Sequence, residues 1–139
     1  MRQIVSVIFL ISAGLILSAH LYVPNRNKCD QYRNGTFYYH FKINEKISQY
    51  TVTRNDSMQI EANDKTGDIA KYSIRWIDNC SYELKFIGGS KILPEELLNL
   101  KKTMVVQTTI LSGTTEYYLF KSTTNLTKLV LSDTIWLKK

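Results

Sequence analysis

The sequence predicts a small all-β domain, built as an antiparallel meander or as a calycin-like barrel of seven to nine short strands with one short helix. Apolar and polar residues alternate over most of the chain downstream of residue 28. Clusters of Asn, Asp and Gly separate these alternating runs, and one segment has the pattern of a helix instead. Because successive side chains of a strand point to opposite faces, this alternation indicates strands with one buried face.

The first predicted strand spans residues 36–41, where aromatic residues favour extended structure. Its alternate positions place three rings on one face: Phe37, Tyr39 and Phe41. Strands at 49–54 and 58–62 flank an Asn-Asp turn and form the clearest hairpin. The apolar positions of the second of these strands are Met58, Ile60 and Ala62. Gln59 and Glu61 point to the opposite face.

The next hairpin consists of strands at 71–76 and 80–86, joined by an Asp-Asn turn. The apolar positions of the first strand are Tyr72, Ile74 and Trp76. Those of the second strand are Cys80, Tyr82, Leu84 and Phe86. We therefore expect Trp76 to be a central core residue and Cys80 to point inward.

A helix is predicted at 94–102, with Pro94 in its first turn, acidic residues near its start and lysines near its end. Its leucines are expected to be buried against the sheet: Leu93, Leu97, Leu98 and Leu100. The remaining strands are predicted at 104–111, 116–121, 128–131 and 135–137.

The N-terminus has the layout of a secretory signal. An uncharged run covers residues 4–19, and the small residues Ser18 and Ala19 favour cleavage that leaves a mature chain beginning near His20. Residues 1–22 are thus expected to be a signal peptide or, if uncleaved, an N-terminal anchor, which would be the chain's only contact with a membrane. Residues 23–139 form a single β-rich domain, and the protein is expected to be periplasmic, on the cell surface or extracellular.

The chain contains two cysteines, Cys29 and Cys80. In an oxidising compartment such a pair is typical of one disulfide bond, and the alternative is two buried thiols. We expect the disulfide, which would attach the segment entering the domain to the sheet. No metal site is expected, because only His20 and His40 could join the cysteines as nitrogen or sulfur ligands.

The sequence shows no pattern typical of an enzyme. His40 lies in a predicted strand without a nucleophile beside it, and no glycine-rich phosphate loop is present. Glu95 and Glu96 could be a carboxylate pair for glycoside hydrolysis. Acidic residues at the start of a helix are, however, ordinarily explained by their favourable interaction with the helix dipole. Because these motifs are absent, we expect no cofactor and no catalytic residue. The net charge of +6 is spread along the chain, so we also expect no nucleic-acid partner.

Aromatic residues give the sequence two alternative interpretations. They could line a ligand cavity, as in lipocalin-type barrels, or fill a small β core. The candidates on the predicted inner faces are Tyr50, Tyr72, Trp76, Tyr82 and Phe86. Periodicity does not separate a hollow barrel from a packed sheet.

Three stretches, residues 29–37, 53–61 and 74–84, resemble small exported proteins of flavobacteria and other Bacteroidetes whose function is uncharacterised. The Trp-x-x-x-Cys-x-Tyr element that starts at Trp76 is the most specific part. Some proteins of this kind carry a DNA topoisomerase IV label. This chain has neither an ATP-binding loop nor the length of such an enzyme. The resemblance implies a common scaffold and no catalytic residue.

Three classes of function remain open on the sequence, and the last of them is a hydrolase whose site is not visible in it. The first is an exported, non-enzymatic envelope or extracellular accessory protein that acts through protein or glycan contacts. The second is a lipocalin-like carrier of a small apolar ligand in an aromatic-lined cavity. A cavity inside the sheet would favour the carrier, whereas a filled interior with an exposed apolar patch would favour the accessory protein.

Overall fold

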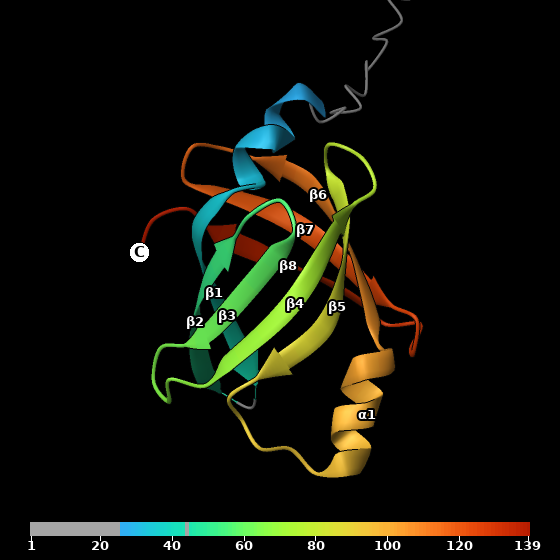
Figure 1. Cartoon of the computed structure of the whole chain (residues 1–139). Helices are drawn as coiled ribbons and strands as arrows, with labels where there is room; N and C mark the ends of the chain where they lie inside the picture. Colours follow the sequence, from blue (N-terminus) through green and yellow to red (C-terminus); the bar gives the residue numbers. More distant parts are fainter. Residues whose placement is uncertain (1–25, 44) are drawn as a thin grey trace, which may run out of the picture.

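A computed structural model describes residues 26–43 and 45–139 of the chain. In these residues eight antiparallel strands, each paired with the next, form a closed barrel (Figure 1). The predicted antiparallel barrel of seven to nine strands is therefore confirmed, and it is formed by a meander that closes on itself. The predicted leader lies outside the described residues. The elements, in chain order, are the 3-10 helix η1 (Arg26–Tyr32), β1 (Gly35–Ile43), β2 (Lys46–Arg54), β3 (Met58–Asn63), β4 (Ile69–Trp76), β5 (Ser81–Gly89), α1 (Glu95–Thr103), β6 (Val105–Gly113), β7 (Tyr117–Thr124) and β8 (Val130–Trp136).

The barrel closes where β1 meets β8. Tyr38 pairs with Trp136 and Tyr39 with Ile135, whereas β1 pairs with β2 along its whole length. Closure removes the free edges that an open antiparallel sheet would expose. Because the β1–β8 pairing ends at Tyr39 within the described residues, the two strands are joined near the η1 end of the barrel and not near the α1 end.

The η1 end of the barrel is closed and densely packed. Helix η1 lies across it (Figure 1), and the predicted disulfide joins Cys29 of η1 to Cys80, with 5.2 Å between their Cα atoms. The Tyr32 hydroxyl donates to the carbonyl of Thr114, 3.0 Å away. Tyr32 packs so closely on Gly113 that a side chain at this glycine would overlap the tyrosine ring. The 3-10 helix is thus attached to the barrel by covalent, polar and packing contacts.

Arg54 of β2 links η1 to the strands at this closed end. The residue is charged but only 3% exposed. Its guanidinium donates to the Gln59 side chain at 2.8 Å and to the carbonyl of Tyr32 at 2.9 Å. It also donates to the hydroxyls of Tyr82 and Tyr118, at 3.0 and 3.1 Å. A buried guanidinium needs such partners, because an unpaired buried charge is strongly destabilising.

Trp76 is not the central core residue that the sequence predicts. It is half-buried at the end of β4, with its ring centroid 4.8 Å from that of Tyr82 and the Arg33 guanidinium 4.6 Å from its ring. The physical reason is its place at the rim of the closed end, where Tyr82 already fills the interior. Trp76 therefore covers the packed layer and does not form its centre.

The predicted helix is present as α1, but its leucines do not cover the sheet. Leu97 is 41% exposed and Leu100 51% exposed, and α1 contains no buried residue. A barrel closed on itself has no uncovered inner face that a helix must protect. The helix instead lies beside the open end of the barrel, between β5 and β6 (Figure 1).

Candidate functional site

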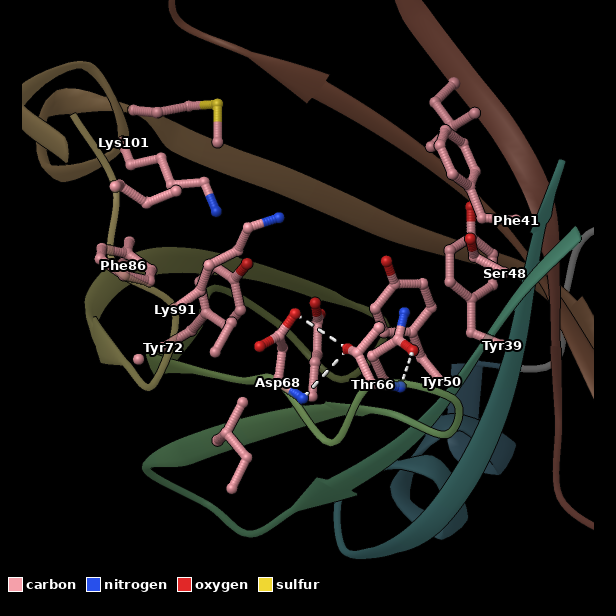
Figure 2. A pocket seen from close by; sticks show the side chains of 18 residues that line it. Tyr39, Phe41, Ser48, Tyr50, Thr66, Asp68, Tyr72, Phe86, Lys91 and Lys101 are labelled. Carbon is pink, nitrogen blue, oxygen red and sulfur yellow. Dashed lines mark hydrogen bonds between the residues drawn. The ribbon is translucent and has the colours of Figure 1, made fainter. Parts of the chain in front are cut away.

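A cavity of about 750 Å³ lies in the α1 end of the barrel (Figure 2). Five aromatic residues from four strands form much of its wall: Tyr39, Phe41, Tyr50, Tyr72 and Phe86. Loops following β3 and β5, together with α1, contribute the residues at its mouth. The barrel therefore has a half-open cavity at one end, and the wall of this cavity is mainly apolar.

A smaller chamber of about 160 Å³ lies deeper in the barrel. It shares Tyr39, Glu61 and Tyr72 with the larger cavity. Its other walls are mostly aliphatic or aromatic: Val52, Leu84, Val106, Phe120 and Ile135. Its polar walls include Thr108 and Ser122, whose hydroxyls are 2.7 Å apart and satisfy each other. The lumen thus narrows from a wide aromatic mouth to a small apolar chamber above the packed closed end.

The structure separates the five aromatic candidates that the sequence groups together. Tyr50, Tyr72 and Phe86 line the larger cavity. Tyr82 lines the bottom of the inner chamber and belongs to the packed core. Trp76 lines neither space. The aromatic candidates therefore line a cavity at one end of the barrel and pack in the core at the other.

Glu61 is a functional candidate that the sequence analysis did not select. On β3 the polar residues Gln59 and Glu61 face the lumen, and the apolar residues of that strand face outward. The Gln59 amide donates to a Glu61 carboxylate oxygen at 2.7 Å, and the Tyr72 hydroxyl also hydrogen-bonds to Glu61. Most strands of the barrel turn apolar residues inward, whereas β3 turns Gln59 and Glu61 inward. Such an exception to the pattern is typical of a functional site and could have identified this group.

The lumen shifts the ionisation of its acidic and phenolic groups. Burial raises the pKa of Glu61 above its ordinary value, although the hydrogen bond from Gln59 and the charges of Arg54 and Lys101 act against this shift. Burial, together with the nearby carboxylate of Glu61, also raises the pKa of the Tyr72 hydroxyl. The cavity therefore contains neutral hydrogen-bonding hydroxyls beside a carboxyl group that is costly to ionise.

Replacing Glu61 with glutamine is expected to stabilise the protein at neutral pH. Because the pKa of Glu61 is raised on folding, its contribution to stability is greatest below the pKa of the unfolded glutamate and falls as pH rises towards the folded pKa. Glu61→Gln removes this loss while keeping an acceptor for Gln59. Urea unfolding should show the variant more stable than wild type at neutral pH and similar to it near about pH 3.5.

Glu83→Gln provides a control of opposite sign, because hydrogen bonds from Arg75 lower the pKa of Glu83. That variant should lose stability at neutral pH relative to acid pH. A Glu61→Gln variant that is less stable than wild type at neutral pH would contradict the assignment of a destabilising buried carboxyl group.

Two lysines and one aspartate lie at the mouth of the cavity: Lys91, Lys101 and Asp68. The Lys101 ammonium is 5.2 Å from the centre of the Phe86 ring. Asp68 accepts a hydrogen bond of 2.8 Å from the Thr66 hydroxyl. In the described part of the chain, the ion pairs closer than 4 Å involve Arg33, Arg75 and Lys139, and neither mouth lysine takes part in one.

Exposed aliphatic side chains occur on the segments at the same end. Ile92, between β5 and α1, is 95% exposed, and Leu129, between β7 and β8, is 78% exposed. Leu97 and Leu100 of α1 add to this surface. The α1 end thus combines a hollow interior with several exposed aliphatic side chains.

Comparisons with known protein families, curated proteins and solved structures find no match for this chain. Within residues 26–43 and 45–139, no helix is long and apolar enough to cross a membrane. The same residues contain no cluster of three or more His, Cys, Asp or Glu that could hold a metal ion. The site is therefore interpreted from its own geometry, which offers a shaped apolar space with a few polar groups.

Proposed function

We propose that this chain is an exported, lipocalin-like binding protein that carries a small, largely apolar ligand in its aromatic-lined cavity, without catalysing a reaction. The observation that carries the proposal is the cavity of about 750 Å³ at the open end of the barrel. Small-molecule sites are typically concave, mainly apolar spaces of this size with a few oriented polar groups. The Cys29–Cys80 disulfide supports an oxidising compartment, as expected of an exported carrier.

The two ends of the barrel differ in a way that supports a carrier function. At the closed end the disulfide, η1 and the Arg54 network hold the strands together. At the open end the aromatic walls leave a cavity. Glu61 is buried beside this cavity, although its burial reduces the stability of the fold. Groups that reduce stability in a cavity are typical of binding sites.

Filling the cavity is expected to abolish ligand binding. Ala70 of β4 lines the cavity and pairs with Glu61 across the sheet, so Ala70→Trp would place an indole in the space. The uncharged fluorophore N-phenyl-1-naphthylamine should bind wild type with an increase in fluorescence. We expect Ala70→Trp to weaken this binding by at least about tenfold.

Ala62→Trp is the matched control, because Ala62 is half-buried on the adjacent strand but faces outward. It should change probe affinity by less than about twofold. Circular dichroism and urea unfolding of both variants check that each folds. Wild-type protein that does not bind the probe, or equal binding by Ala70→Trp, would overturn the proposed carrier function.

The exposed aliphatic surface favours a second candidate function, an accessory protein that acts through contacts. Ile92 and Leu129 have the largest exposed fractions on this surface. If contacts are the function, Ile92→Ser combined with Leu129→Ser should weaken association with a purified envelope fraction and leave probe binding unchanged. If carriage is the function, Ala70→Trp is the variant that removes activity.

A further inference from the structure

We infer that the ligand is an amphiphile with an anionic headgroup, which Lys91 and Lys101 bind at the mouth of the cavity while its apolar part extends towards the inner chamber. This inference rests on the proposed function. It adds the chemical class of the ligand and its orientation in the barrel.

The two lysines are placed to bind an anion. Figure 2 shows their side chains on the same side of the cavity, both extending towards its interior. Neither makes an ion pair closer than 4 Å among the described residues. The Lys101 ammonium does lie over the Phe86 ring, and its charge acts on Glu61. Two like charges at one opening repel each other, and an anion between them would remove that repulsion and add charge-assisted hydrogen bonds.

The acidic residues near the mouth compete only weakly with such a headgroup for the two lysines. Asp68 is engaged by the Thr66 hydroxyl, 2.8 Å away. Glu61 lies deeper, where it already accepts hydrogen bonds from Gln59 and Tyr72. The lysines are therefore the accessible charged donors of the cavity, since Arg54 is buried in the closed end.

The orientation follows from what lies deeper. A headgroup that moved inward would meet the Glu61 carboxyl and then the largely apolar walls of the inner chamber. An anion is strongly disfavoured in such surroundings. A chamber of about 160 Å³ is close to the size of an apolar protein cavity that accepts one benzene molecule. The narrow end of the lumen thus fits the end of a chain or one ring, and the charged group stays at the mouth.

Competition against N-phenyl-1-naphthylamine tests the inference with three probes of equal chain length: dodecanoate, 1-dodecanol and dodecylamine, each below its solubility limit and any micellar concentration. Dodecanoate should bind at least about tenfold more tightly than 1-dodecanol, and dodecylamine should bind most weakly. Added salt should reduce the advantage of dodecanoate, because it screens charges at the solvent-exposed mouth. Dodecyl phosphate, as a fourth probe, distinguishes a phosphate headgroup from a carboxylate.

Lysine variants locate the headgroup. Lys91→Gln and Lys101→Gln should each weaken dodecanoate binding by about threefold to tenfold and leave 1-dodecanol within about twofold of wild type. Lys102→Gln is the matched control, since Lys102 is exposed on α1 and does not line the cavity. Glu61→Gln is measured with dodecylamine, to test whether the Glu61 carboxyl binds a cationic headgroup.

The outcomes separate the inference from the proposed function. Equal affinity for all three probes, or no effect of the two lysine variants, would overturn the inference and leave the carrier function standing. Tighter binding of dodecylamine that depends on Glu61 would overturn it in favour of a cationic ligand. If the fluorophore itself does not bind, the proposed function fails.

Discussion

Replacing Arg54 with methionine is expected to lower the free energy of unfolding by about 3–5 kcal/mol. The guanidinium is almost fully buried, and its donors meet the Gln59 side chain, the carbonyl of Tyr32 and two tyrosine hydroxyls. Methionine keeps much of the side-chain volume but leaves these acceptors without their partner. Buried polar groups that lose their hydrogen bonds keep their full desolvation penalty.

The stacking contacts of Arg54 add to this effect. Its guanidinium carbon lies 5.1 Å from the centre of the Phe37 ring and 4.7 Å from that of Tyr82. A desolvated cation on an aromatic face is more stabilising than an exposed one. Arg54→Met therefore removes a set of hydrogen bonds and also weakens the contact between η1 and the barrel.

Urea unfolding followed by circular dichroism measures the loss. Arg75→Met is the control, because Arg75 forms an ion pair with Glu83 on the outer surface of the same barrel and is exposed. That variant should lose less than about 1 kcal/mol. If Arg54→Met and Arg75→Met were equally stable, the buried network would not be a principal contributor to the closed end.

The strands could be predicted because their signal is local. The faces of 36–41 and 80–86 follow directly from alternating apolar residues, and the structure places Phe37 and Tyr82 in the core. The inward direction of Cys80 and its disulfide with Cys29 follow from the same alternation combined with an even cysteine count. Short-range periodicity determines which side of a strand is buried, whatever the sheet then does.

The end of the chain shows where periodicity was misleading. The sequence predicts two strands, 128–131 and 135–137, because polar residues interrupt the apolar pattern between them. The structure has one continuous strand, β8. Asp133, at the interruption, accepts a hydrogen bond of 3.1 Å from the Tyr39 hydroxyl of β1. A partner distant in sequence satisfies this polar side chain, and periodicity does not include such partners.

The candidate site could be predicted only in part, for a related reason. Tyr50, Tyr72 and Phe86 were identified as aromatic residues of an inner face, and they do line the cavity. Whether the inner face is filled depends on barrel closure between β1 and β8, a contact between the two ends of the domain. Glu61 and Lys101 become neighbours of the same cavity only once β3 and α1 are placed around it. Contacts between residues so far apart in the sequence depend on the whole fold and leave no local pattern.

Removing the disulfide is expected to destabilise the protein by about 4 kcal/mol. Cys29 and Cys80 are separated by 51 residues, and a crosslink over this span greatly reduces the freedom of the unfolded chain. Both cysteines are buried, so Cys29→Ser combined with Cys80→Ser would also place two hydroxyls in a packed layer. The measurement is urea unfolding of the double variant against wild type, with reduced wild type as an independent route to the same loss.

The double variant also tests whether the two ends of the barrel act independently. The disulfide attaches η1 to the closed end, whereas the cavity lies at the α1 end and contains neither cysteine. Without denaturant, the folded double variant should therefore bind N-phenyl-1-naphthylamine within about twofold of wild type, although it unfolds at a much lower urea concentration. A loss of stability below about 1 kcal/mol would show that η1 is held mainly by Tyr32 and the Arg54 network. A large loss of probe affinity would show instead that the closed end controls the shape of the open end, through the strands that run between them.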